Sequence, residues 1–258
     1  MKKPSWIIEK EKARRAGANE RLWLFGLHAV EDALRNPARQ KFRLVLTQNA
    51  LTRLGEAVGM GELTPEIADP RRFPVPLDPS SVHQGAALEV RPLDWGPLDV
   101  LATAPGEGAP VFVLLDRVTD PHNVGAVLRS AEVFGARAVV APRRHSAPET
   151  GALAKSASGA LERQPYVRVA NLANTITELQ KLGFRVIGLD GTGTADLPDE
   201  IAATPGPLAL VLGAEGPGLR EKTKETCDIL AKIPFAGAFG SLNVSNAAAV
   251  ALYSASRR

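Results

Sequence analysis

Two segments in the last third of the chain decide its fold: LALVLGAEGPGLR at residues 208–220 and IPFAGAFGSLNVSNAAAVALY at residues 233–253. The first begins as a continuous apolar run, which is typical of a buried strand, and ends in a glycine-rich loop. The second passes through small polar residues into an alanine-rich stretch that predicts a helix. A third segment, LLDRVTDPHNVGAVLRSAEVFGA at 114–136, repeats the order of strand, loop and helix.

Around these segments, the whole region 111–258 alternates apolar strands with helices. Strands are expected at 111–115, 138–141, 166–169, 184–189, 208–213 and 229–234, and helices near 123–134, 151–163, 172–182, 217–226 and 243–256. This alternation predicts an α/β fold, with a parallel sheet covered by helices on both faces. In all three segments the polar or glycine-rich part follows the carboxyl end of a strand, where open parallel sheets bind ligands.

The chain before residue 111 has a different pattern. Residues 22–95 predict a small α+β domain with helices near 24–36 and 50–59 and strands at 42–47 and 87–93. Residues 96–110 are rich in proline and glycine and are expected to be a linker. Seven Lys or Arg and three Glu lie in residues 1–21, so this arm carries more than the chain's formal net charge of +3. A basic arm suits contact with RNA phosphates, and a solvated tail is the alternative.

Composition excludes several classes of protein. The chain of 258 residues is 45% hydrophobic and 23% charged, the profile of a globular protein. No apolar run approaches the ~20 residues of a membrane helix. The single cysteine, Cys227, excludes an internal disulfide, favours a cytoplasmic location and has no partners for a metal site. We therefore expect neither membrane nor metal to take part.

Polar residues in two of the three segments allow a structural and a functional interpretation. Asn123 stands where a helix N-cap belongs, and Arg129 lies off the apolar stripe of the same predicted helix. Ser241, Asn243 and Ser245 are equally compatible with ordinary caps. No G-x-S-x-G motif surrounds Ser241, so a hydrolase nucleophile is not expected there.

The glycine-rich loop at 213–218, called the glycine loop below, also allows more than one interpretation. Its glycines permit a positive φ or a close approach to a ligand, and Glu215 suits the first turn of a helix. A phosphate-binding loop is disfavoured, because G-x-x-x-x-G-K-[ST] is absent and the Glu215 carboxylate would repel phosphate. A nicotinamide-dependent oxidoreductase is also disfavoured, since no G-x-G-x-x-G follows the first strand of the sheet.

Taken together, the three segments resemble the three motifs of the SpoU/TrmH branch of the SPOUT methyltransferases. The resemblance implies methylation of a ribose 2′-hydroxyl in RNA with S-adenosylmethionine as the cofactor. It makes Arg129 the essential arginine and Asn123 and Glu215 site residues. It also implies that backbone groups around Gly213 hold the cofactor.

The resemblance extends to the end of the chain. It assigns Ile233 and Leu242 to the adenine pocket and places Ser241 and Asn243 beside the methyl donor and the target ribose. It implies a C-terminal trefoil knot, an exception to the rule that chains are not knotted. It further implies a homodimer whose active site is built across two catalytic domains.

A narrower resemblance covers the first domain. LFGLHAVEDAL and VHQGAALEV, through Gly26, His28, His83, Gln84 and Gly85, are similar to the RNA-binding domain of the RlmB group, which methylates a guanosine of bacterial 23S rRNA. A tRNA ribose methyltransferase, an antibiotic-resistance rRNA methyltransferase and a non-catalytic RNA-binding or assembly protein remain alternatives. The first domain argues against the short tRNA enzymes, and the presence of Arg129 and Asn243 argues against loss of catalysis.

The role of Arg129 has two chemical interpretations. The family proposal makes it the general base that deprotonates the ribose hydroxyl. A guanidinium has a pKa above ~12, so its neutral form is scarce. A charged Arg129 that grips a phosphate and stabilises the developing alkoxide is easier to defend.

Overall fold

The computed structural model describes residues 20–78, 81–236 and 242–258. The described residues form two compact units. The first extends to Asp94 and includes Glu149–Lys155, and the second contains Trp95–Pro148 and Ser156–Arg258. Nearly all of the expected basic arm 1–21, and Ser241, lie outside the described residues.

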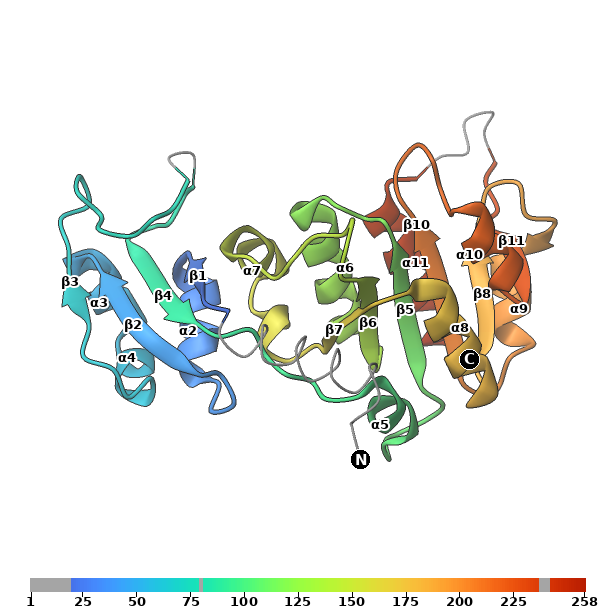
Figure 1. The fold of residues 1–258 in the computed structure, drawn as a ribbon, viewed down its shortest axis with the longest axis horizontal. Helices are drawn as coiled ribbons and strands as arrows, with labels where there is room; N and C mark the ends of the chain where they lie inside the picture. Colours follow the sequence, from blue (N-terminus) through green and yellow to red (C-terminus); the bar gives the residue numbers. More distant parts are fainter. Residues whose placement is uncertain (1–19, 79–80, 237–241) are drawn as a thin grey trace, which may run out of the picture. The chain divides into compact units, whose positions relative to one another are not determined.

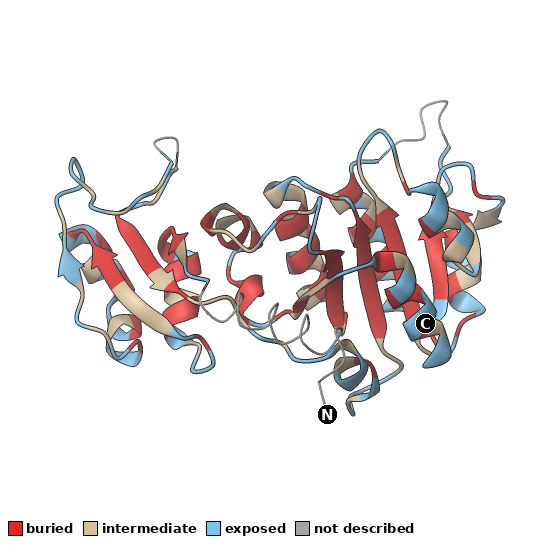
Figure 2. Ribbon diagram, in the orientation of Figure 1, coloured by how far each residue is buried: buried red, intermediate tan, exposed pale blue. Residues whose placement is uncertain are grey.

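The second unit is built on a seven-stranded parallel sheet of order β7-β6-β5-β10-β8-β11-β9 (Figure 1). Its strands are β5 (Val111–Asp116), β6 (Ala138–Pro142), β7 (Tyr166–Val169), β8 (Arg185–Leu189), β9 (Ala195–Asp196), β10 (Leu208–Gly213) and β11 (Ile229–Lys232). The central strands β5, β6 and β10 are buried almost throughout (Figure 2). Burial on both faces explains why their sequences are continuous apolar runs.

Helices cover both faces of this sheet, as the sequence predicts. They are α5 (Leu98–Thr103), α6 (Pro121–Val133), α8 (Leu172–Lys181), α9 (Leu197–Ala202), α10 (Glu221–Thr226) and α11 (Val244–Ala255), with the 3₁₀ turn η1 (Ala160–Glu162). Phe112 and Leu114 point to the face that α5 and α8 cover, where they pack with Ile176 and Leu179. The intervening residues of β5 point to the opposite face because side chains alternate along a strand. Helix α11 packs there against α6 and β10.

The start of α6 differs from the expectation for Asn123. The N-cap is Asp120, whose carboxylate accepts a hydrogen bond from the backbone N–H of His122, and Pro121 occupies the first turn. Proline suits this position because it lacks the N–H that a first turn leaves unpaired. Asn123 is therefore inside the helix, and its side chain is available for another role. Gly135 has φ 71° just past the helix end, as its predicted place after the C-cap requires.

Several elements differ from the expectation. The segment 96–110, expected as a linker, contains α5, and Ala102 of α5 is buried in the core of the second unit. The short elements β9 and α9 lie in a region with no apolar run long enough to indicate a strand. The expected helix 151–163 is divided into α7 (Gly151–Ala157) and η1, because Ser158 and Gly159 both have positive φ.

The first unit contains a four-stranded sheet of order β1-β4-β2-β3. Its elements are β1 (Leu22–Phe25), α2 (Leu27–Arg35), β2 (Lys41–Leu46), α3 (Gln48–Leu54), α4 (Glu56–Met60), β3 (Glu66–Ile67) and β4 (Ala86–Val90). The helix expected from residue 24 begins only at Leu27, because Gly26 turns the chain out of β1 with φ 90°. Glycine tolerates that φ without a steric penalty.

The VHQG segment has a structural role in this unit. Gly26 has no side chain to cap α2, and the Gln84 side-chain oxygen accepts a hydrogen bond from the N–H of Leu27 at 3.1 Å instead. His83 stacks on Phe73 at 4.2 Å between ring centroids, and its Nδ1 accepts from the N–H of Gly85. Residues about 57 positions apart thus complete one helix terminus, which explains why the two short motifs occur together.

Candidate active site

Three loops meet at the carboxyl edge of the parallel sheet, and each comes from one of the segments singled out in the sequence. They follow β5, β10 and β11, and they lead to α6, α10 and α11. Because β10 lies next to β5, the first two loops are neighbours at this edge. The edge is the place where an open parallel sheet binds ligands.

The side chains of Asn123, Glu215 and Asn243 form one hydrogen-bonded cluster at this edge. The amide nitrogen of Asn123 donates to Oε1 of Glu215 at 3.0 Å. The amide nitrogen of Asn243 donates to Oδ1 of Asn123 at 3.0 Å and to the same carboxylate oxygen. The cluster joins α6, the glycine loop and the start of α11, which are separated by up to 120 positions in the chain. The structure therefore brings together three of the predicted site residues.

Asn243 is also the N-cap of α11. Its Oδ1 accepts from the backbone N–H of Ser245 at 2.8 Å and from the Ser245 hydroxyl at 2.5 Å. The sequence allows three residues as the N-cap of this helix, and the structure shows that Asn243 is the cap. Its amide nitrogen remains directed at Glu215, so the cap fixes the orientation of a site residue.

Arg129 does not join this cluster within one chain. It lies six positions after Asn123 on α6, which places it about 9 Å further along the axis and roughly 120° around the helix. Its side chain is exposed, and no hydrogen bond or ion pair to another described residue holds it. The surface position agrees with the prediction that Arg129 lies off the apolar stripe, whose members Val124, Val127 and Leu128 are buried.

The glycines of the loop after β10 serve two different purposes. A Cβ on Gly213 would lie 2.1 Å from the carbonyl carbon of Gly218 and 2.3 Å from the nitrogen of Leu219, so glycine is required for the loop to fold back on itself. Gly218 donates to the Ala214 carbonyl at 2.9 Å and closes that turn. Gly216 and Gly218 have φ of 80° and 67°, and no atom lies within 4 Å of the place where either would carry a Cβ. Open space therefore lies beside this part of the backbone.

Asp116 and Arg220 form a supporting pair that the sequence analysis missed. Asp116 ends β5 and is fully buried, and its carboxylate accepts from the backbone N–H of Arg220 at 3.0 Å and from its guanidinium at 2.7 Å. The pair fixes the end of the glycine loop to the end of the neighbouring strand. An acidic residue at the end of the apolar run VFVLLD was the available signal.

A cavity of about 420 Å³ opens beside the glycine loop. Its lining includes Thr119, Glu215, Pro217, Gly218 and Leu219. The volume lies in the range of small-molecule sites. Ile233 directly follows β11 and is half-buried, and Leu242 precedes the cap of α11 with 49% of its surface exposed; neither lines this cavity.

Across residues 20–78, 81–236 and 242–258, no three His, Cys, Asp or Glu side chains gather in a way that would hold a metal ion. None of the helices formed by these residues combines the length and the apolar character needed to span a bilayer.

Comparison with known proteins places these features among rRNA methyltransferases. The model of the SpoU rRNA Methylase family matches residues 110–253. The 23S rRNA (guanosine-2'-O-)-methyltransferase RlmB of Vibrio vulnificus is 39% identical over 250 residues, with 92% of this chain and 96% of the relative covered. The protein of the same name from Ralstonia nicotianae is 42% identical over 243 residues, with 91% and 95% covered.

Solved structures agree with the sequence relatives. The SpoU methyltransferase AviRb from Streptomyces viridochromogenes, in complex with the cofactor AdoMet, superposes with a TM-score of 0.76 at 26% identity, covering 96% of this chain and 92% of AviRb. An AdoMet-bound rRNA methyltransferase from Sinorhizobium meliloti gives a TM-score of 0.73 at 24% identity, covering 95% and 90%. The likeness therefore extends over both units.

Proposed function

Because the chain belongs to the SpoU rRNA methylase family, we propose that it methylates the ribose 2′-hydroxyl of a guanosine in 23S rRNA with S-adenosylmethionine as the methyl donor. The observation that carries this proposal is the cluster of Asn123, Glu215 and Asn243, in which the three motif segments meet at the carboxyl edge of the sheet. The relatives named as 23S rRNA guanosine methyltransferases cover both units, which supports this substrate over tRNA.

The glycine loop and the residues around α11 are proposed to hold the cofactor. Open space beside the backbone of Gly216 and Gly218 fits a ligand held through main-chain groups after Gly213. Ile233 and Leu242 supply apolar surface for adenine, and Ser241 is assigned to the same site by the family motif. When bound, the cofactor supplies a methyl group on a positively charged sulfur.

Arg129 is proposed to act as a charged group at the ribose. Its guanidinium is free of partners among the described residues, so it can bind an RNA phosphate and stabilise the negative charge that develops on the 2′-oxygen. Asn123, Glu215 and Asn243 orient the ribose and hold the surrounding loops in place. The hydroxyl proton then passes to phosphate or water, because a cationic arginine cannot accept it.

A homodimer would complete this site. Arg129 is separated from the cluster within one chain, while its neighbour one turn along α6, Val133, is 75% exposed. Val250 and Tyr253 of α11 are also exposed apolar residues, and the ring of Tyr253 contacts Phe134 at the end of α6. A second copy packed on this face would cover the apolar residues and place its Arg129 at the cluster of the first.

Other parts of the proposal rest on the family resemblance. The trefoil knot at the carboxyl end of the chain is proposed from the family resemblance. The first unit, with the basic arm 1–21, is proposed to bind the RNA, and the residues from 111 onward to carry out catalysis. Since the substrate is ribosomal RNA, we place the protein in the cytoplasm.

The test is methylation of defined RNA in vitro. Protein, S-adenosylmethionine and transcribed 23S rRNA should give a single 2′-O-methylguanosine, located by reverse transcription at low nucleotide concentration. Calorimetry should detect binding of S-adenosylmethionine and no comparable binding of NAD. Methylation of bulk tRNA in preference to 23S rRNA would reassign the substrate, and equal binding of NAD would contradict the assigned cofactor.

A further inference from the structure

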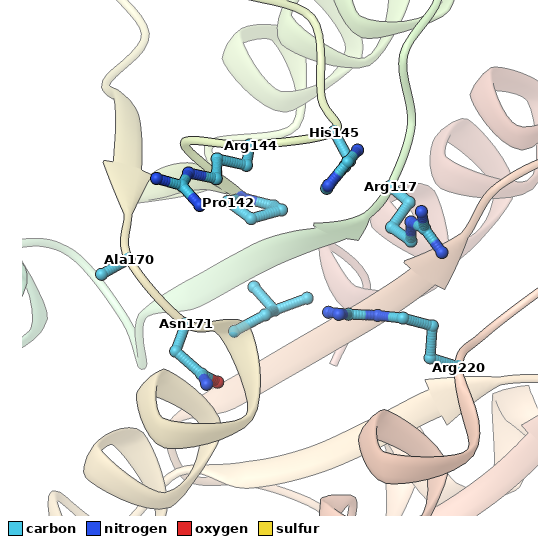
Figure 3. Close-up of a pocket in the computed structure, with 8 residues that line it drawn as sticks. Arg117, Pro142, Arg144, His145, Ala170, Asn171 and Arg220 are labelled. Atoms are coloured by element: carbon cyan, nitrogen blue, oxygen red, sulfur yellow. The ribbon is translucent and has the colours of Figure 1, made fainter.

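A second cavity, of about 200 Å³, lies at the same edge of the sheet but on the side away from Glu215. Its lining is Arg117, Pro142, Arg144, His145, Ala170, Asn171, Leu172 and Arg220. They lie at or beyond the carboxyl ends of the adjacent strands β5, β6, β7 and β10. Figure 3 shows the Arg220 side chain extending into the pocket, with Arg117 and His145 on the facing side.

The charge of this pocket is strongly positive. Three arginines and a histidine line it, and no carboxylate does. Arg220 is neutralised by Asp116 beneath it, whereas Arg117 and Arg144 have no ion-pair partner among the residues that the structure describes. Two uncompensated guanidinium groups at one cavity favour an anionic ligand, and the planar fork of arginine is suited to phosphate oxygens.

The backbone at two of these residues is unusual. Arg117 has φ 62° and His145 has φ 58°, and they are two of only five described non-glycine residues with positive φ. This conformation is unfavourable for a non-glycine residue, and such residues cluster at functional sites. Each occupies the turn just beyond a central strand, and both residues line the pocket.

The pocket adjoins the candidate active site. Arg117, His145 and Arg220 line both this cavity and the larger one beside Glu215. An anion in the smaller pocket would therefore lie next to the place assigned to the target ribose. In an RNA substrate, the anions beside a ribose are its own phosphodiesters.

We propose that Arg117, Arg144 and His145, with Arg220, form a binding site for a backbone phosphate of the substrate RNA close to the methylated nucleotide. This inference rests on the proposed function. It assigns to the catalytic unit itself an RNA contact that is independent of the first unit and of Arg129. The contact is to the backbone, so it positions the strand and does not read its bases.

The test uses the full-length chain with three variants and one control. Arg117→Gly removes a charge and suits the positive φ, so the melting temperature should stay the same or rise. Arg144→Ala removes the second charge, and the third variant combines both changes. Lys181→Ala is the control, because it also removes one exposed cation but lies at the far end of α8 from Asn171.

Binding of transcribed 23S rRNA is measured by filter retention between about 50 and 200 mM KCl. The double variant should bind roughly tenfold more weakly and should lower the slope of log affinity against log salt concentration by about 0.7, the value for the loss of one phosphate contact. The control should retain the wild-type slope. Affinity for S-adenosylmethionine should fall less than affinity for rRNA in every variant, and the KM for rRNA should rise more than kcat falls.

Two results would overturn the proposal while leaving the function intact. One is that the double variant keeps the salt slope of the wild type, although the wild-type enzyme methylates 23S rRNA. The other is a loss of S-adenosylmethionine binding larger than the loss of RNA binding, which would assign the pocket to the cofactor's carboxylate. A wild-type chain that neither binds nor methylates 23S rRNA would instead refute the proposed function, and this inference with it.

Discussion

At the scale of single residues, Arg129 allows folding and catalysis to be separated. Its side chain is exposed and without a described partner, so Arg129→Ala should change the free energy of unfolding by at most about 0.5 kcal/mol. Loss of a cation positioned at a developing alkoxide should lower kcat by about 10²–10³-fold or more. Denaturant unfolding and single-turnover methylation measure the two effects. Arg129→Lys should rescue poorly because it lacks the planar fork, and near-wild-type turnover of Arg129→Ala would refute the assignment.

Cys227, in contrast to Arg129, is expected to have a purely structural role. Burial, followed by the charges of Asp228 and Asp116, raises the pKa of its thiol to about 12. The thiolate is the reactive form, so at pH 8 the folded protein should react with a disulfide reagent at least about 100-fold more slowly than the unfolded chain. Absorbance after mixing, with and without denaturant, measures both rates. Rapid labelling of the folded protein would show that the thiol is accessible and ionised.

At the scale of elements, the loop after β10 depends on the absence of a side chain at Gly213. Gly213→Ala would push a Cβ into the backbone of Gly218 and Leu219, so the loop must shift at a cost of about 1–3 kcal/mol. Because this loop is proposed to hold the cofactor, S-adenosylmethionine binding by calorimetry should fall strongly. Gly191→Ala is the control, since nothing lies within 4 Å of its Cβ position. Equal effects of the two substitutions would contradict the argument.

The elements that the sequence predicts well are those whose signal is local. Strands β5, β6 and β10 read as apolar runs because both of their faces are buried. The convergence of Asn123 and Glu215 could be expected, since both follow neighbouring parallel strands. Asp116 at the end of its apolar run could be expected at the same edge, but its pairing with Arg220 could not, because Arg220 lies seven residues beyond the end of β10 and the path of the loop between them is not a local pattern.

The cap of α6 shows how a local pattern can also mislead. Asn123 and Asp120 are both good N-cap residues, and the apolar stripe begins directly after Asn123. Pro121 decides between them, because it is favoured in the first turn and so moves the helix start upstream. The same shift frees the Asn123 amide for the site. A residue that is interpreted as a cap can therefore be a functional residue when a better cap precedes it.

At the scale of the whole molecule, the proposed dimer makes a prediction about the face of α6 and α11. Val133 is 75% exposed and lies on the face that a second copy would cover. Val133→Glu should leave the fold of one chain unchanged but disfavour the dimer, since it would bury an unpaired charge at the interface. Light scattering should give about the chain mass of 27.4 kDa for the variant and twice that mass for the wild type. A wild-type chain that is monomeric and fully active would refute the dimer.

A complementation experiment tests whether the active site is shared between two copies. Arg129→Ala removes the proposed cation, and Asn243→Ser removes the amide that contacts Glu215 while keeping a residue able to cap α11. Each variant alone should be inactive. In a mixed dimer with shared sites, one of the two sites receives Arg129 from one copy and Asn243 from the other, and is intact. Co-refolding equal amounts should therefore restore roughly a quarter of the wild-type activity, because half of the dimers are mixed. If each site were built within one chain, every site in the mixture would carry one defect and no activity would return.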